Sequence, residues 1–511
     1  MAELLEIRPG EMTLAELRRI GRGVGRMALD PACRAAVDAS AAVIARIVEA
    51  GEMAYGVTTG FGKLAQTRIP GDHLAELQLN LVRSHAAGVG EPLPAPVVRL
   101  MLALKINNLA QGFSGVRYDL LDALVRFFNS GLVPVVPAKG SVGASGDLAP
   151  LAHMTLALVG EGSIFVDGRA APAGDALRAK GLSAVVLGPK DGLSLLNGTQ
   201  ASTAMALTAL FDAEEIFAAA VAAGAMSVDA AKASDTPFDP RIHRVRRHRG
   251  QVEIAAVYRR LIAGSRIRES HLACDRVQDP YSLRCQPQVM GACLDLLGQA
   301  AATLRDEANA VSDNPLVFAD DGAVLSGGNF HAEPVAFAAD IIALALAEIG
   351  ALAERRIALL VDATASGLPP FLVQDSGVNS GFMIAHVTAA SLASENKLLA
   401  HPASVDSLPT SANQEDHVSM AAFAARRLAD IAANARGIVA IELLAAAQGI
   451  DFHAPMKSSV AIENIKARLR ALVPFYDRDR VLSRDIEAAI GFTREPLFIE
   501  LMQDVLPTRG V

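Results

Sequence analysis

Long alanine-rich stretches with helical spacing of apolar residues most restrict what this chain can fold into. They cover about 193–233, 288–311, 333–362, 379–400 and 416–449. Each carries an apolar face wide enough to be buried against other helices. Strand-like segments are few, and two short hairpins are expected, one at the Asp167-Gly168 turn and one within 315–325. We therefore predict a mainly α protein, built as a large bundle of long helices with short β-hairpins.

Shorter helices are expected before and after this bundle. Thr13-x-x-Glu16 is a capping box and predicts the start of the first helix. Apolar spacing predicts further helices at about 31–50, from about residue 73, and as a pair within 95–131. Because no fixed-period repeat or low-complexity linker divides the 511 residues, we expect a single body. Within it, 1–200 would form an N-terminal part, 201–450 the long-helix bundle and 451–511 the C-terminal helices.

The charge balance argues against a nucleic-acid partner. Net charge is −8, and a protein that binds polyanions is typically basic. One basic run, 241–249, contains no aromatic side chains. It is best interpreted as a solvated helix face or a salt-bridge surface between subunits.

We expect a cytoplasmic protein without a membrane partner. The most apolar candidate span, 341–361, is interrupted by Glu348, Glu354 and two arginines, which are costly in lipid. The N-terminus lacks the basic and apolar regions of a secretory signal. The four cysteines, at positions 33, 274, 285 and 293, show no Cys-x-x-Cys spacing, so we expect reduced thiols.

Residues 140–154 form an unusual glycine-rich segment, with Gly140, Gly143 and Gly146 around Ala144-Ser145. Taken alone, the segment is a loop that turns sharply before a helix. Ser145 or Asp147 would then cap that helix.

Several polar clusters stand out against the alanine-rich background: 278–288, 312–314, 327–331 and 413–417. Individually each can be a cap, a turn or a buried hydrogen-bond network. The same holds for Tyr55 in a glycine-rich loop, for His85 near a helix end and for Asn197. The sequence contains no His-Glu-x-x-His motif, so no metal is expected, and no Gly-x-Ser-x-Gly elbow supports a serine hydrolase.

Taken together, the run 140–154 and the polar clusters resemble, in order and over nearly the whole chain, the motifs of the aromatic amino acid ammonia-lyases. The resemblance implies the elongated helical architecture of the fumarase/aspartase-like superfamily and a homotetramer with shared active sites. Ser84-His85 and 404–417 resemble the histidine-specific members. The implied reaction is therefore non-oxidative deamination of L-histidine to trans-urocanate and ammonia.

In that family an Ala-Ser-Gly tripeptide cyclises to the electrophile 4-methylidene-imidazol-5-one (MIO). The resemblance implies that Ala144-Ser145-Gly146 does so here, with no external cofactor. Attack of the Gly146 nitrogen on the Ala144 carbonyl needs a tightly bent backbone, and Ser145 then loses its hydroxyl. The electrophile could accept either the amino group or the aromatic ring of the substrate.

The resemblance also assigns roles to individual side chains. Tyr55 would remove the β-proton. Arg284 would bind the substrate carboxylate, and Asn197 and Gln278 would hold the carboxylate and electrophile region. Tyr281 would position the substrate and electrophile, and Phe330 would help to form the pocket. His85 and Glu415 would contact the imidazole ring.

Two departures and several alternatives stay open. Val57-Thr58-Thr59 stands where histidine-specific members more often have Ile-Asn-Thr, and Arg83 stands where an apolar residue is common. The nearest rivals are a tyrosine or phenylalanine ammonia-lyase and an aromatic 2,3-aminomutase with the same electrophile. A fumarase-like lyase without a cofactor and a non-catalytic helical assembly protein are the alternatives from other classes.

Overall fold

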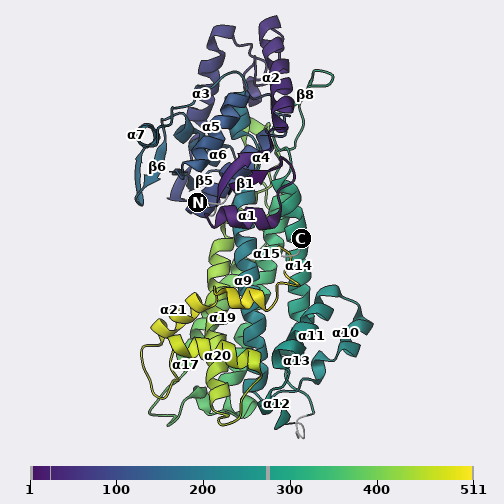
Figure 1. The fold of residues 1–511 in the computed structure, drawn as a ribbon, viewed down its shortest axis with the longest axis vertical. Coiled ribbons are helices and arrows are strands. Elements are labelled where there is room, and N and C mark those ends of the chain that lie inside the picture. The colour runs from purple at the N-terminus through teal and green to yellow at the C-terminus, as the bar shows by residue number, and fades with distance from the viewer. Residues whose placement is uncertain (1–3, 24, 272–276, 509–511) are drawn as a thin grey trace. The chain divides into compact units, whose positions relative to one another are not determined.

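Long helices dominate the computed structural model of the chain, which describes residues 4–23, 25–271 and 277–508 (Figure 1). Five long helices are α9 (Gln200–Ala230), α14 (Gln286–Ala308), α15 (Glu333–Val361), α17 (Met383–Leu399) and α19 (Leu428–Asp451). The strands are two to four residues long. The prediction of a mainly α chain with short hairpins is thus confirmed.

The described residues group into two compact units. Unit 1 takes in the chain up to Thr208 together with Ala301–Asp340 and Pro402–Arg426. Unit 2 takes in Ala209–Ala300, Ile341–His401 and the chain from Arg427 onward. The three-part division expected from the sequence stays a prediction.

Unit 1 combines short helices with four small sheets. Its helices include α1 (Leu14–Gly21), α2 (Cys33–Ala50), α3 (Leu74–His85), α4 (Ala95–Leu109), α5 (Tyr118–Asn129), α6 (Leu148–Leu158), α7 (Ala173–Ala179), α8 (Asp191–Leu196) and α18 (Ala421–Arg426). Helix α1 begins with the predicted capping box, because Thr13 Oγ1 accepts the Glu16 N–H and the Glu16 carboxylate accepts the Thr13 N–H.

The sheets of unit 1 pair neighbouring or nearby segments. Strands β1 (Leu4–Ile7) and β2 (Arg26–Leu29) are parallel, whereas β3 (Val89–Pro92) and β5 (Pro137–Lys139) are antiparallel. Strand β4 (Val133–Pro134) adds to the hairpin of β6 (Ser163–Val166) and β7 (Arg169–Pro172). Both predicted hairpins are confirmed: Asp167 and Gly168 turn with positive φ, and β8 (Leu316–Phe318) pairs with β9 (Ala323–Leu325).

The core of unit 1 surrounds α4, which is buried on nearly every side from Val97 to Leu109. Three polar side chains lie within this buried stretch, those of Lys105, Asn107 and Asn108. Helix α4 packs on α1 and α5, and α3 packs on α6 and α8. Because a buried polar side chain needs partners, these three positions point to a network inside unit 1.

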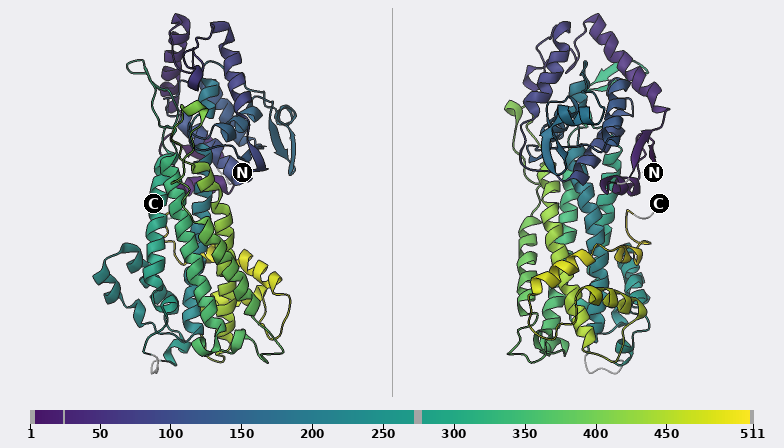
Figure 2. Two further views of the ribbon diagram at one scale, coloured as in Figure 1. Left: turned by 180° about the vertical axis from the view of Figure 1, so that it is seen from behind. Right: turned by 60° about the vertical axis from the view of Figure 1, so that its left-hand side comes forward.

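In unit 2 the long helices run side by side, as the views of Figures 1 and 2 show. Helix α19 packs against α17 and against α21 (Leu482–Phe492). The smaller helices include α10 (Pro240–Arg246), α11 (Arg249–Ile262), α12 (Arg266–Glu269), α13 (Tyr281–Arg284), α16 (Ala363–Ser366), α20 (Val460–Leu472) and α22 (Pro496–Glu500). Helix α15 is long and apolar enough to cross a membrane by length and composition, and 61% of its most apolar window is buried within the chain.

Two long helices predicted from the sequence are interrupted. The stretch expected at 416–449 is helical only from Ala421 onward, as α18 followed by α19, because Met420 has φ +58° and its N–H donates to the Val142 carbonyl. The stretch expected from residue 193 breaks between α8 and α9, where Gly198 has φ +126°. In both places the chain leaves the helix to contact the glycine-rich segment.

Candidate active site

The glycine-rich loop between β5 and α6 is clamped from two sides. On one side Gly146 pairs with Gly198 in a parallel bridge, and the Asp147 N–H donates to the Gly198 carbonyl at 2.7 Å. On the other side Ser419 Oγ donates to the Gly143 carbonyl at 3.0 Å. Both breaks in the predicted long helices therefore serve to hold this loop.

Close backbone approach makes glycine necessary at two positions of the loop. A Cβ at Gly146 would lie 2.2 Å from the Gly198 carbonyl oxygen, and one at Gly143 would lie 2.2 Å from Ser419 Oγ. Both glycines also have φ in the left-handed region, +76° and +66°. The loop thus has the sharp bend and the residue without Cβ that backbone cyclisation needs.

The tripeptide fits the group that the family resemblance implies. Ala144 is buried in a small apolar cluster with Val418 and Met420. Ser145 is half-buried, and its Oγ donates to Glu415 Oε1 at 2.6 Å. The Ala144 carbonyl and Gly146 nitrogen flank a bent backbone, so the residues present can form the ring.

Asp147 begins α6 but does not cap it, which corrects the expected cap. Its side chain makes no cap hydrogen bond. The carboxylate instead accepts hydrogen bonds from Ser202 N and Oγ at 2.7 and 2.8 Å and from Ser141 Oγ at 2.9 Å. Burial raises the pKa of Asp147 despite these donors. Its role is to tie the loop to the start of α9.

Glu415 lies where several donors converge on one carboxylate. Oε2 accepts hydrogen bonds from Thr410 Oγ1 at 2.6 Å and Ser411 Oγ at 2.9 Å, while Oε1 accepts the Ser145 hydroxyl. Burial acts to raise the pKa of Glu415, but these hydrogen bonds and the charge of His85 outweigh it, and the pKa is lowered. The carboxylate is therefore ionised at neutral pH.

The other predicted residues of unit 1 lie on loops and helix ends. His85 is the last residue of α3, and its Nδ1–H donates to the Leu81 carbonyl at 2.8 Å. Tyr55 is half-buried in the loop after α2, and its hydroxyl accepts the Gly62 N–H at 3.1 Å. Phe330 is half-buried in the turn before α15.

Asn197 is buried, but half of its amide lacks a partner. Nδ2 donates to the Asn314 carbonyl at 3.3 Å, while Oδ1 accepts no hydrogen bond from the described residues. An unsatisfied buried acceptor is costly, and a bound ligand with a donor would satisfy it. This orphaned oxygen supports a ligand-binding role for Asn197.

Beneath Asn197 lies a buried ionic network that sequence reasoning missed. Lys105 Nζ donates to the carbonyls of Ser194 at 3.0 Å and Asn197 at 2.5 Å. Lys190 Nζ contacts Asp313 Oδ2 at 2.9 Å, with both side chains fully buried. Burial lowers the pKa of Lys105 to about 7. The only signal for this network in the sequence was the position of Lys105 and Lys190 close to apolar residues.

Unit 2 holds the remaining three predicted residues, Gln278, Tyr281 and Arg284. The Arg284 guanidinium carbon lies 4.6 Å from the centroid of the Tyr281 ring. Gln278 and Arg284 line a cavity of about 490 Å³. Arg284 Nε is buried without a hydrogen-bond partner among the described residues, as expected of a group that binds an anion.

Comparison with known proteins identifies the family of the chain. Residues 12–471 match the family model of aromatic amino acid lyases. A histidine ammonia-lyase of Burkholderia pseudomallei (strain 668) is 62% identical over 498 residues, covering 98% of each chain.

Solved structures share the fold as well. The crystal structure of histidine ammonia-lyase from Trypanosoma cruzi has a TM-score of 0.91 at 40% identity, covering 99% of this chain and 97% of that one. Tyrosine aminomutase from Streptomyces globisporus has a TM-score of 0.92 at 34% identity, covering 98% and 99%. With the bent Ala144-Ser145-Gly146 loop and a family match over most of its length, the chain belongs to the aromatic amino acid lyases.

Proposed function

We propose that this lyase eliminates ammonia from L-histidine to give trans-urocanate. The observation that carries the choice of substrate is the ionised carboxylate of Glu415 beside Ser145. An imidazole N–H can donate to Oε1 of this carboxylate in place of the Ser145 hydroxyl, which the proposed ring formation removes, whereas a phenyl ring offers no donor. The 62% identical relatives that are named histidine ammonia-lyase support the same substrate.

The proposed electrophile is MIO, formed from Ala144-Ser145-Gly146 without an external cofactor. When formed, it would supply an acceptor that draws electrons from the bound substrate. The clamps on Gly143 and Gly146 support this proposal, because they hold the backbone bent at the two ends of the tripeptide. The buried carboxylate of Asp147 and the hydrogen bond from Lys105 to Asn197 hold the neighbouring backbone.

The side chains carry out proton removal and substrate orientation in this proposal. Tyr55 acts as the base that removes a proton from the β-carbon. The electrons of the C–H bond form the Cα–Cβ double bond, the C–N bond breaks and ammonia leaves. Arg284 binds the substrate carboxylate through two parallel N–H donors, a geometry that lysine cannot reproduce.

The remaining residues shape the pocket. Oδ1 of Asn197 accepts a hydrogen bond from the ligand, and Gln278 and Tyr281 position the carboxylate and the electrophile region. Phe330 forms part of the pocket wall. His85 and Glu415 address the two nitrogens of the imidazole ring, which can donate at one position and accept at the other.

The proposed assembly is a cytoplasmic homotetramer whose active sites are built from several subunits. Helix α17 supports an assembly, since it exposes Ile384 (64%), Val387 (55%) and Leu398 (77%). The cysteines at 33, 285 and 293 are free, which fits a reducing compartment, and Cys274 lies outside the described residues. Light scattering on a sizing column tests the tetramer, and a monomer with full activity would contradict it.

The test of function is an ultraviolet assay of the purified protein with L-histidine, L-tyrosine and L-phenylalanine in parallel. Each elimination product is conjugated and absorbs at its own wavelength. We expect urocanate from histidine, and no product from histidine with Ser145→Ala. Cinnamate or coumarate as the main product would refute histidine as the substrate, and β-amino acids without free ammonia would identify an aminomutase.

A further inference from the structure

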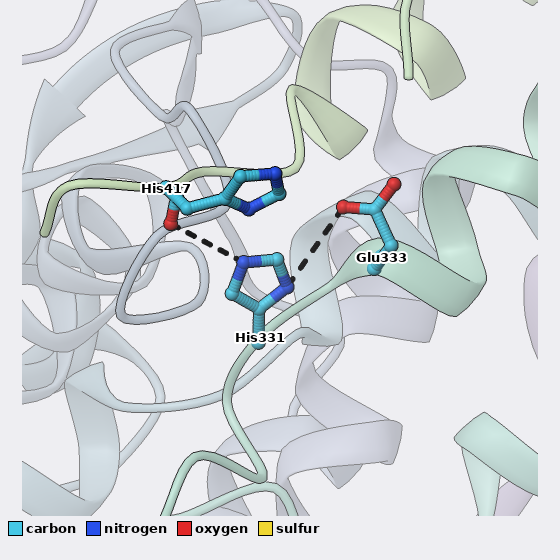
Figure 3. Close-up of side chains that lie close together, drawn as sticks. All are labelled: His331, Glu333 and His417. Atoms are coloured by element: carbon cyan, nitrogen blue, oxygen red, sulfur yellow. Dashed lines mark hydrogen bonds and ion pairs between the residues drawn. The ribbon is translucent and has the colours of Figure 1, made fainter. Parts of the chain in front are cut away.

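Two histidines and a glutamate from separate parts of the chain converge in unit 1 (Figure 3). His331 precedes α15, and Glu333 is the first residue of that helix. His417 lies 86 residues after His331. One ligating atom from each of the three side chains lies within 4.8 Å of the other two. A search for local zinc motifs cannot find such a cluster, because its ligands are far apart in sequence.

The hydrogen bond of His331 fixes which ring nitrogen is free. Nε2 lies 3.3 Å from the carbonyl oxygen of His417, and a carbonyl can only accept, so Nε2 carries the hydrogen. In the neutral ring Nδ1 then presents its lone pair, and it faces Glu333 Oε2 at 4.0 Å, too far for a hydrogen bond (Figure 3).

Glu333 Oε2 is itself buried and accepts no hydrogen bond from the described residues. Two acceptors, Nδ1 of His331 and Oε2 of Glu333, therefore face each other. An acceptor left in this way costs free energy, and a cation between the two would satisfy both.

His417 supplies the third possible ligand atom of the cluster. Its ring stacks on that of His331 with centroids 5.6 Å apart and planes inclined by 22°. Figure 3 shows one of its ring nitrogens directed toward the space between His331 and Glu333. The third donor therefore comes from a different segment of the chain and approaches the same point.

We propose that His331, Glu333 and His417 bind a divalent transition-metal ion of the Zn²⁺ type. Two imidazoles and a carboxylate are ligands that Zn²⁺ accepts, and water would take a fourth position. Zn–N and Zn–O bonds of about 2.0–2.2 Å require small rotations of the three side chains to draw their atoms closer. The hydrogen bond from His331 to a backbone carbonyl is the outer contact that orients a metal-bound imidazole.

The bound ion would join two segments that flank the active site. His417 follows Glu415 by two residues, and His331 follows Phe330 directly. The backbone before Glu415 is strained, since Ser411, Ala412 and Asn413 all have positive φ. A metal ion at His417 would therefore restrain the segment that carries the Glu415 carboxylate.

Calorimetric titration of the chelator-treated full-length protein tests the site. We expect Zn²⁺ to bind with one equivalent per chain and Mg²⁺, which prefers oxygen ligands, to bind far more weakly. His331→Ala and His417→Ala should each weaken Zn²⁺ binding by at least about 100-fold, since even outer contacts of metal ligands change affinity by 10–100-fold. Glu333→Gln, which keeps the shape of the side chain, should weaken it as well.

His73→Ala is the matched control. His73 and Glu76 form an exposed pair at 3.0 Å that resembles the His331–Glu333 pair but has no third ligand. This variant should bind Zn²⁺ like the wild type. Equal loss in His73→Ala and His331→Ala would show general binding to surface histidines and overturn the proposal.

A second measurement does not depend on the folding of any variant. Co²⁺ added to the wild-type protein should give the intense visible absorption of a four-coordinate site, and one equivalent of Zn²⁺ should remove it. Absence of this absorption together with no saturable Zn²⁺ binding would overturn the proposal. The cluster would then be explained by its hydrogen bond and ring contact alone.

Discussion

Each of the two units buries an ionic network, and the two networks are built differently. In unit 2, Arg356 on α15 and Glu442 on α19 are both fully buried and share two hydrogen bonds of 2.5 and 2.7 Å. Ser227 Oγ donates to the same carboxylate at 2.7 Å. Opposite charges are matched directly, so this pair fastens two long helices within unit 2.

In unit 1 Lys190 and Asp313 form a fully buried ion pair of this kind. The Nζ of Lys105 contacts backbone carbonyls, and the Asp147 carboxylate accepts hydrogen bonds from serine hydroxyls and backbone N–H groups. Burial consequently lowers the pKa of Lys105 to about 7 and raises that of Asp147. These two groups hold the backbone around Asn197 and Gly146.

The difference teaches that buried charge serves two purposes in one chain. Where it joins helices, as at Arg356, the charges are paired and loss of one partner should cost stability. Where buried charge holds the glycine-rich loop, as at Lys105 and Asp147, the hydrogen-bond partners are backbone groups and hydroxyls. Substitution of these residues should therefore change activity and pH dependence. Variants in the two networks test whether stability and activity depend on different buried charges.

Ser145→Ala should have the largest effect on function. Loss of the side chain that becomes the electrophile should lower turnover of histidine by about 1000-fold or more. The free energy of unfolding should change by only about 1 kcal/mol, because one hydrogen bond to Glu415 is lost. Assay of urocanate and urea denaturation measure the two quantities, and an active variant would contradict both the electrophile and the comparison.

Glu442→Gln should have the largest effect on stability. It leaves the buried Arg356 charge without its carboxylate, and breaking such a pair costs about 3–5 kcal/mol. The specific activity of the protein that remains folded should stay near that of the wild type. Glu253→Gln, in the exposed Arg249–Glu253 pair, is the control and should denature like the wild type.

Lys105→Met should change how stability depends on pH. The folded-state pKa of about 7 lies below the ordinary lysine pKa of 10.5, so between these values the unfolded chain binds more protons. The Lys105 contribution to stability is therefore complete above the unfolded pKa and is lost as pH falls through about 7.

Urea denaturation of the wild type and of Lys105→Met, followed from about pH 6 to about pH 9, measures this contribution. Stability of the wild type should gain up to about 1.4 kcal/mol per pH unit relative to the variant above pH 7. Parallel curves would show that Lys105 does not titrate in this range and would weaken the contrast with Arg356.

Ala412→Gly should have the smallest effect and the opposite sign. Ala412 has φ +53° and ψ +46°, a left-handed conformation that costs alanine about 1–2 kcal/mol and glycine little. The variant should be more stable by about 0.5–1 kcal/mol in denaturant titration. Ala42→Gly, exposed within α2, is the matched control and should be less stable by about 1 kcal/mol.

Features written in local sequence were predictable before the structure. The capping box at Thr13 and the turn at Asp167-Gly168 depend on residues three or fewer positions apart. Helix type was equally clear for α15 and α17, where apolar spacing persists over several turns. Ser145 and Glu415 were found through the resemblance, and their hydrogen bond across 270 residues agrees with a shared site.

Features set by distant contacts were not predictable. Apolar spacing predicts a helix from 416 to 449, but the helix begins only after Met420, whose N–H donates to the distant Val142 carbonyl. Lys105 lies in an apolar helix, and its partners are carbonyls 89 and 92 residues away. Propensity and periodicity report on neighbours along the chain, so they contain no information about such contacts.

The hydrogen bond from Ser419 to Gly143 also determines when, during synthesis of the chain, the loop can be held on both sides. Ser419, which holds that glycine, is translated 276 residues later. At about 5–20 residues per second, the loop waits roughly 14 to 55 seconds on the ribosome before its second clamp exists. If the proposed ring closure depends on both clamps, it can begin only after Ser419 has been synthesised and has folded onto the loop. A chain truncated before residue 419 would then keep Ala144-Ser145-Gly146 as an ordinary tripeptide.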